Sequence, residues 1–205
     1  MFHLFTIEEE TFSLLQQIFS IPEIKKKFAL AGGTSLALQI GHRRSVDLDI
    51  FSSTPLDTRE LEILLSSTPG FHFQPVNSTR NMLFTYINGI KCDFVYEPST
   101  LLQPYIENNG IALFHTNDIA AMKMHTVCGR GRKKDFFDIY ALTEVMGWNN
   151  MLHLFEKKYG PDQFYFLWKS IAYFNDADDD PDITGFSPFV KSWAEVKQHI
   201  TTVCR

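Results

Sequence analysis

Two aspartates that lie one residue apart, Asp47 and Asp49, have the types and the spacing of a reactive site. They fall in the run VDLDIF, residues 46–51, whose polar and apolar side chains alternate as in a β-strand. Alternation directs both carboxylates to one face, and we expect the apolar residues of the run, Val46 among them, to point into the core. Two neighbouring carboxylates repel each other, and a hard divalent cation relieves that repulsion. A solvated strand face is the alternative interpretation.

A third carboxylate, Asp93, occupies the polar position of another apolar run, IKCDFVYE at residues 90–97. If the two strands are neighbours, Asp93 joins Asp47 and Asp49 as a metal ligand and permits a two-metal arrangement. Mg²⁺, or Mn²⁺ in its place, is the expected ion, because Mg²⁺ binds one or two carboxylates and completes its shell with water and substrate phosphates.

A glycine pair, Gly32 and Gly33, precedes the aspartates by one short helix. The run FALAGG, residues 28–33, predicts a strand that enters a tight turn at the start of that helix, residues 34–40. Backbone N–H groups at a helix N-terminus bind phosphate, and the hydroxyls of Thr34 and Ser35 would add to them. The order of glycine pair, short helix and paired aspartates therefore indicates phosphate donors beside a metal site.

A second group of polar residues lies in DIAAMKMHTVCGRGRKKDFFDIYAL, residues 118–142. Lys123 interrupts an apolar helical pattern, where a lysine can also simply extend its stem along the core. Asp135 and Asp138 are three residues apart and so share one helix face, although Asp135 would also suit the first turn of a helix on electrostatic grounds alone. The basic run GRGRKK, residues 129–134, is either a solvated turn or a contact for triphosphate or RNA.

The remaining pattern places strands in the first half of the chain and helices in the second. We expect an α+β fold, with a mixed sheet and helices in an N-terminal lobe at residues 1–110 and a helical bundle at 111–205. Asn88-Gly89 predicts a hairpin. Predicted strands are 28–31, 46–51, 71–77, 81–89 and 90–98, and predicted helices are 6–19, 58–66, 117–128, 134–146, 150–158, 162–174 and 188–203.

Residues 32–51, GGTSLALQIGHRRSVDLDIF, resemble the signature of nucleotidyltransferases of the DNA polymerase beta superfamily, and more narrowly that of the AbiEii/AbiGii toxin family. The family pattern reads roughly Gly-Gly-Thr-x-Leu, then His-Arg-x-Ser-x-Asp-Leu-Asp. The matching positions are Gly32, Gly33, Thr34, Leu36, His42, Arg43, Ser45, Asp47, Leu48 and Asp49. A second family block matches Lys123, Arg130, Lys134, Asp135 and Asp138. The resemblance covers residues 28 to about 145 and implies a nucleotidyltransferase-like sheet.

The resemblance also implies roles for these residues. The expected catalytic residues are Asp47, Asp49, Lys123 and Asp135, with Asp135 either a general base or an anchor for Lys123. Nucleotide-binding residues would be Gly32, Gly33, Thr34, Arg43, Ser45 and Lys123, with His42, Arg130, Lys134 and Asp138 in support.

The function implied is metal-dependent transfer of a nucleoside monophosphate from an NTP to an acceptor, either RNA such as the tRNA 3′ end or a protein hydroxyl. The family further implies a toxin restrained by a cognate antitoxin protein, in toxin–antitoxin or phage defence. Two alternatives remain: a small-molecule nucleotidyltransferase of aminoglycoside-modifying type, which the acidic run Asp176–Asp182 would suit, and an inactive nucleotide- or partner-binding protein. We otherwise expect that acidic run to be a solvated loop.

The composition limits the broad class. The formal net charge of −5 excludes a wholly basic nucleic-acid coat, although not a local basic patch. Three widely spaced cysteines without metal-binding spacing predict reduced thiols in a cytoplasmic protein. The N-terminal residues do not have the pattern of a signal peptide, and we expect no membrane span.

Overall fold

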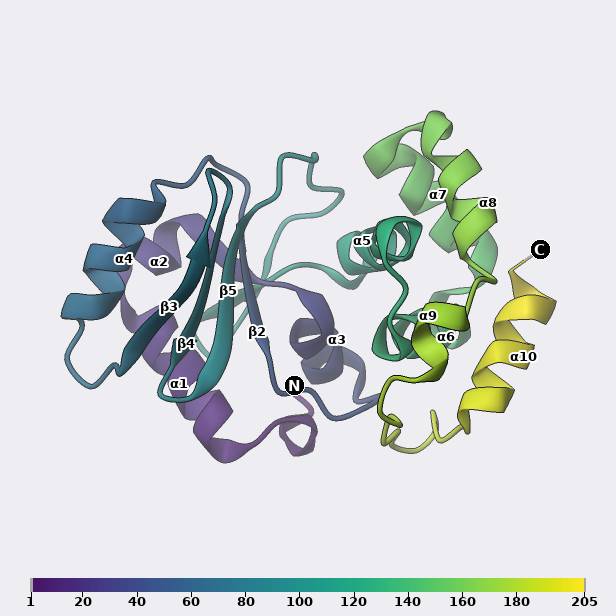
Figure 1. Ribbon diagram of the computed structural model, residues 1–205, viewed down its shortest axis with the longest axis horizontal. Coiled ribbons are helices and arrows are strands. Elements are labelled where there is room, and N and C mark those ends of the chain that lie inside the picture. Colours follow the sequence, from purple (N-terminus) through teal and green to yellow (C-terminus); the bar gives the residue numbers. More distant parts are fainter. Residues whose placement is uncertain (1, 205) are drawn as a thin grey trace.

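The computed structural model describes residues 2–204, in which seven strands form one mixed sheet with helices against both faces (Figure 1). The strand order is β3-β4-β5-β2-β1-β7-β6. Strands β2 and β5 are parallel, as are β1 and β7, and the other neighbours are antiparallel. The strands are β1 (Phe28–Leu30), β2 (Leu48–Ser52), β3 (Phe73–Ser78), β4 (Met82–Ile87), β5 (Ile90–Tyr96), β6 (Ile106–Asn108) and β7 (Ile111–Leu113).

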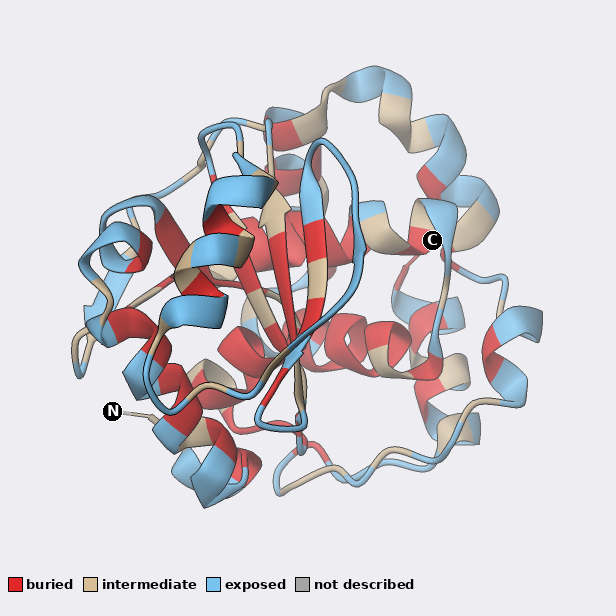
Figure 2. Cartoon of the chain, turned by 60° about the vertical axis from the view of Figure 1, so that its left-hand side comes forward, coloured by how far each residue is buried: buried red, intermediate tan, exposed pale blue. Residues whose placement is uncertain are grey.

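Alternation along the central strands sorts their side chains into two hydrophobic cores. Leu48 and Ile50 of β2, with Cys92 and Phe94 of β5, pack into the core beneath α1 (Glu9–Ser20), α2 (Pro22–Lys27) and α4 (Thr58–Ser67). The residues between them, including Asp49 and Asp93, therefore belong to the opposite face, toward the helical half of the molecule. In Figure 2 the buried colour follows the central strands and the helices next to them.

The second core joins that opposite face to the C-terminal helices. It includes residues of α3 (Gly32–Ile40), α5 (Thr116–Gly129), α6 (Lys133–Met146), α7 (Trp148–Tyr159), α8 (Phe164–Ser170), the short α9 (Asn175–Asp178) and α10 (Trp193–Val203). Helix α3 lies between the sheet and the C-terminal helices, as Figure 1 shows. The predicted α+β class, a mixed sheet followed by a helical bundle, is confirmed.

Strands β6 and β7 are absent from the sequence-based prediction. They form a hairpin through Asn109 and Gly110, both with positive φ, and β7 pairs with β1. The sheet therefore continues to Leu113, past the boundary predicted at residue 110. The turn signal Asn109-Gly110 was available, but strands of three residues are too short for a periodic pattern to indicate them.

Two predicted details are wrong. Val46 is 54% exposed, because β2 begins only at Leu48 and the residues before it form a loop. The predicted helix 188–203 begins at Trp193, where Ser192 and Glu195 form a capping box that the sequence already carried. The preceding chain contains a turn at Ser187 and Pro188, and Gly185 forms an isolated β-bridge with Arg43.

Candidate active site

The aspartates of strands β2 and β5 lie side by side at the floor of a cleft. Asp49 and Asp93 are register partners in parallel strands, and Asp47 immediately precedes β2. All three line a cleft of about 680 Å³ between the sheet and helices α5 and α6. Gly32, Gly33, Arg43, Ser45, Lys123, Arg130, Lys134 and Asp135 line the same cleft. The structure therefore gathers most of the predicted site residues in one place.

The loop before β2 is held by the hydroxyl of Thr34. This hydroxyl is completely buried and lies within hydrogen-bond distance of both the Asp47 carbonyl oxygen and, at 2.8 Å, Ser45 Oγ. Thr34 therefore does not face the cleft, and its predicted contact with nucleotide is replaced by a role in fixing the Asp47 backbone. Ser45, which does line the cleft, is buried beside it.

The two glycines allow charged side chains to lie against the start of α3. Gly32 has φ +63°, and a Cβ there would lie 2.1 Å from Asp49 Oδ2. A Cβ on Gly33 would lie 2.3 Å from the guanidinium of Arg43. The first N–H groups of a helix have no partner within it, so this terminus can also donate to an anion. The glycine pair thus brings a carboxylate, a guanidinium and free N–H donors together.

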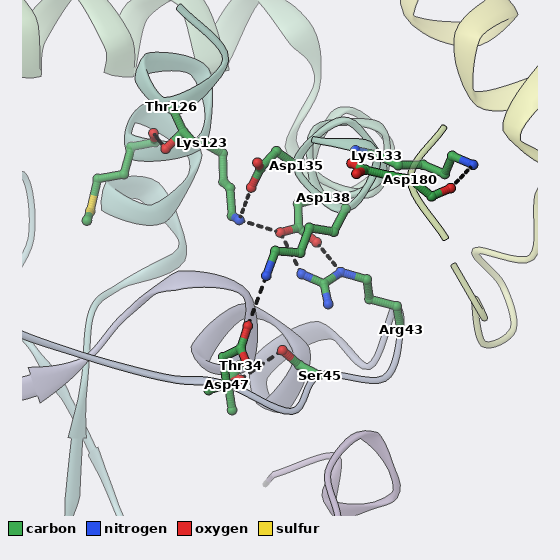
Figure 3. A network of polar contacts seen from close by, with 12 residues as sticks. Thr34, Arg43, Ser45, Asp47, Lys123, Thr126, Lys133, Asp135, Asp138 and Asp180 are labelled. Carbon is green, nitrogen blue, oxygen red and sulfur yellow. Dashed lines mark hydrogen bonds and ion pairs between the residues drawn. The ribbon is translucent and has the colours of Figure 1, made fainter. Parts of the chain in front are cut away.

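Asp138 is the centre of a buried ionic network (Figure 3). Arg43 donates from Nε at 2.6 Å and Nη2 at 2.9 Å, and Lys123 Nζ lies 2.7 Å away. His42 Nε2 contacts the same carboxylate at 2.6 Å. Burial alone would raise the pKa of Asp138, but the charges of Arg43 and Lys123 outweigh it and hold that pKa well below its usual range.

Lys123 is shared between two carboxylates of α6. Its Nζ donates to Asp135 Oδ1 at 2.8 Å, in addition to its contact with Asp138 (Figure 3). Burial would lower the pKa of Lys123, but the two aspartates raise it overall, so the ammonium stays charged. Asp135 Oδ2 is buried without a hydrogen-bond partner. Asp138, expected only in support, therefore has more partners than Asp135, because it faces the loop carrying His42 and Arg43.

Two lysines neutralise two of the three cleft aspartates. Lys134 Nζ lies 3.0 Å from Asp47 Oδ2, and Lys91 Nζ lies 2.5 Å from Asp93 Oδ2. Within residues 2–204 no hydrogen bond or ion pair is found for the carboxylate of Asp49. Burial raises the pKa of Asp49, with the charge of Asp93 adding to it against the lysines. A bound cation would therefore stabilise the charged form of Asp49 more than that of Asp47 or Asp93, which already contact a lysine.

The donor set fits a hard cation, although the site is not a closed metal cage. Among the described residues, no three acidic, histidine or cysteine side chains converge closely enough to hold a metal by themselves. Asp93 Oδ1 is nevertheless buried without a partner, and the carboxylate of Asp49 makes no hydrogen bond or ion pair within residues 2–204. Mg²⁺ needs only one or two carboxylates when phosphates supply other ligands. Asp47, Asp49 and Asp93 therefore suit an ion that arrives with its substrate.

The basic run 129–134 is only partly available to a ligand. The backbone N–H of Lys133 donates to Asp180 Oδ2 at 2.9 Å, and its ammonium also contacts Asp182 at 3.1 Å. Arg132 lies 3.3 Å from Asp180. The acidic run, expected to be a solvated loop, therefore anchors part of the basic run. Arg130 remains exposed on the cleft wall.

Several residues that shape the cleft were missed from the sequence. Lys91 could have been found from its place two residues before Asp93 on the same strand face. His125 and Tyr159, which also line the cleft, carry no local signal. A buried ion pair between Asp118 and Lys158, at 2.8 Å, joins α5 to α7 and was likewise not predicted. The three cysteines are free thiols, as expected.

The fold of this chain is similar to that of solved structures. The toxin MenT4 (Rv2826c) of Mycobacterium tuberculosis H37Rv superposes with a TM-score of 0.55 at 14% identity, over 95% of this chain and 84% of that one. JHP933 from Helicobacter pylori superposes with a TM-score of 0.53 at 14% identity, over 96% of this chain and 91% of that one.

The chain belongs to the AbiEii family of nucleotidyl transferase toxins of type IV toxin–antitoxin systems, whose model matches residues 13–192. It is also 30% identical over 198 residues to the uncharacterized protein aq_aa25 of Aquifex aeolicus (strain VF5), covering 94% of this chain and 93% of the relative. The predicted family is confirmed, and with it the general role of a nucleotidyltransferase toxin. None of the helices among residues 2–204 is both long and apolar enough for a membrane span.

Proposed function

We propose that this protein transfers a nucleoside monophosphate from an NTP to an acceptor hydroxyl in a reaction that depends on Mg²⁺ or Mn²⁺. One observation carries the proposal: Asp47, Asp49 and Asp93 share a cleft with Lys123 and the glycine start of α3. That arrangement combines carboxylates for a divalent cation with donors for phosphate. Bound by Asp47 and Asp49, the ion would neutralise triphosphate charge and lower the pKa of the attacking hydroxyl.

The residues of this chain would act mainly by placing the triphosphate. The N–H groups of Gly32 and Gly33, the hydroxyl of Ser45 and the exposed Arg130 would bind its oxygens. The acceptor hydroxyl would lose its proton to solvent as its oxygen bonds to the α-phosphorus. The bond from that phosphorus to the bridging oxygen would break, and pyrophosphate would leave with its charge opposed by Lys123. Asp135 would keep Lys123 charged and in place, which favours the anchoring role over that of a general base because its second oxygen is buried.

The acceptor we propose is RNA, with the tRNA 3′ end as the first candidate and a protein hydroxyl as the second. The toxin family supports a cognate antitoxin protein as a further partner. The cytoplasm is the site of action that we propose. An aminoglycoside acceptor has less support, because Asp180 and Asp182 of the acidic run bind Lys133 and do not form an open anionic pocket. An inactive nucleotide-binding role has less support too, since all three carboxylates remain in the cleft.

Incubation with each α-labelled NTP, Mg²⁺ or Mn²⁺, and total RNA or a protein extract tests the proposal. We expect label to appear in one acceptor class only when a divalent ion is present, and Asp49→Asn to abolish it. Label on an aminoglycoside but on neither macromolecule would establish the small-molecule alternative. If no acceptor is labelled with any NTP while the nucleotide still binds, the inactive alternative holds.

A further inference from the structure

The cleft extends beyond the aspartates along strands β2 and β5. Asp49 and Asp93 are paired in these parallel strands, so the next residues on the same face, Phe51 and Val95, also lie side by side. Glu97 follows just past the end of β5. Because a strand rises roughly 3.3 Å per residue, Glu97 lies roughly 13 Å further along the chain than Asp93. All five residues line the same cleft.

Two stacked rings form the wall at this end of the cleft. His125 of α5 and Tyr159 of α7 have ring centroids 4.2 Å apart and planes inclined by only 14°. Tyr159 is partly buried, whereas His125 is exposed, so the histidine ring can present its free face to a ligand. Although His125 is exposed overall, partial desolvation of its ring lowers its pKa against the opposing charge of Glu97, which favours the neutral imidazole. The pair thus offers an uncharged aromatic surface.

The cleft surface near α3 and the cleft surface beside Asp93 carry different side chains from the surface along the ends of β2 and β5. Toward α3 lie the helix N-terminus, Arg43 and Ser45, which suit a triphosphate tail. Beside Asp93 lie Phe84, which is its register partner in β4, and Lys91, two residues earlier on β5. The direction along the strands has aromatic and apolar walls and one carboxylate, which suits a nucleobase and not a phosphate.

We propose that His125, backed by Tyr159, is the stacking platform for the base of the incoming NTP, and that Glu97 selects bases with an amino group. This inference rests on the function proposed above. Glu97 Oε1 accepts a hydrogen bond from the backbone N–H of Ser99 at 3.0 Å, and a carboxylate can accept further donors. Adenine, cytosine and guanine each carry an exocyclic amino group that can donate to this carboxylate, whereas uracil has none and offers only its ring N3–H between two carbonyl oxygens.

The test measures binding by calorimetry, with Mg²⁺ and the α,β-methylene analogue of each of the four NTPs, and with inorganic tripolyphosphate as a ligand without a base. The variants are His125→Ala, His125→Phe and Glu97→Gln. The matched control is His153→Ala, which removes an exposed histidine from α7 outside the cleft. Alanine favours a helix, so the substitutions at positions 125 and 153 should leave the fold intact.

His125→Ala should weaken binding of the preferred NTP analogue by roughly 5- to 150-fold and leave the affinity for tripolyphosphate unchanged. His125→Phe should restore binding of the analogue. Glu97→Gln should reduce the discrimination against the uridine analogue by roughly 5- to 150-fold. Equal affinity of wild type and His125→Ala for every analogue would overturn the stacking role of His125. If the wild type binds no analogue at all, the proposed function itself fails, which is a distinguishable result.

Discussion

Arg43 and Asp138 form a buried two-point ion pair that joins the loop before β2 to helix α6 across 95 residues of sequence. Lys123 of α5 contacts the same carboxylate at 2.7 Å. The aspartate therefore connects the loop that positions Asp47 to the two helices that form the other wall of the cleft. Its role is to fix the relative positions of groups that approach the substrate.

Replacement of Asp138 by Asn should strongly destabilise the fold. The substitution leaves Arg43 and Lys123 as buried cations with one fewer anion, and breaking a buried pair in this way costs about 3–5 kcal/mol. Urea unfolding monitored by circular dichroism gives the free energy of unfolding. Asp179→Asn, at an exposed position, is the control and should change it by less than about 0.5 kcal/mol. An equally small change in the free energy of unfolding of Asp138→Asn would mean that the ionic network contributes little to stability.

Replacement of Asp49 by Asn should separate activity from stability. Burial and the charge of Asp93 already raise the pKa of Asp49, so a neutral amide removes an unfavourable charge from the fold. We expect nucleotidyl transfer to fall by at least roughly 100-fold, because a ligand of the proposed ion is lost. The Tm should stay the same or rise.

Transfer assays and thermal melts of the same preparation check this prediction, with Asp162→Asn as an exposed control outside the cleft. A drop of many degrees in the Tm of Asp49→Asn would show that this carboxylate stabilises the fold. Retained activity would remove it from the catalytic site.

The strands and helices of the site were largely predictable, because they follow local rules. The alternation in residues 46–51 indicated that Asp47 and Asp49 are linked to an apolar strand, and Asn88-Gly89 indicated the hairpin that brings β5 beside β4. The assignment of Asp93 to the same face as Asp49 also follows from alternation, once the strands are neighbours. Periodicity located the helices that carry Lys123 and Asp135.

The partners of these residues could not be predicted, since they are set by packing between distant segments. No local pattern indicates that Asp138 contacts His42 and Arg43, which lie 96 and 95 residues earlier in the sequence. The same holds for the acidic run, where Asp180 binds Lys133 through contacts 47 residues apart in sequence. The position of Thr34 after the glycine pair predicts a phosphate contact for its hydroxyl. In the structure that hydroxyl donates to the backbone carbonyl oxygen of Asp47, a contact that sequence alone does not indicate.

Replacement of Gly32 by Ala should reduce both stability and transfer activity, although it adds only one methyl group. The residue has a left-handed φ, and the new Cβ would overlap Asp49 Oδ2 at 2.1 Å. Gly70 is a matched control, because it also has positive φ but a Cβ at that position would meet no atom within 4 Å. Gly70→Ala should therefore cost only the backbone strain, about 1–2 kcal/mol.

We expect Gly32→Ala to lose more stability than that control and to lose transfer activity, since Asp49 must move. Thermal melts and transfer assays on both variants check this. Equal loss of stability in the two variants, with activity retained, would show that Asp49 adapts without cost.

His42 should make the stability of the protein depend on pH below neutrality. Burial lowers the pKa of His42, outweighing its hydrogen bond to Asp138, so the folded protein holds a neutral imidazole. As the pH falls through about 6.5, the ordinary histidine value, the unfolded chain takes up a proton that the folded chain does not. The unfolded state then binds more protons, so the free energy of unfolding falls as the pH is lowered from about 7 toward 5.

His42→Asn should reduce the slope of this fall, although the variant is less stable overall because Asp138 loses a well-placed donor. Unfolding free energies measured between pH 5 and pH 8 give the slope for each protein. His72→Asn removes an exposed histidine and should leave the slope unchanged. If wild type and His42→Asn have the same slope, the fold does not shift the pKa of His42. A steeper fall in His42→Asn would mean that the fold raises this pKa and that the contact with Asp138 is an ion pair between two charged groups.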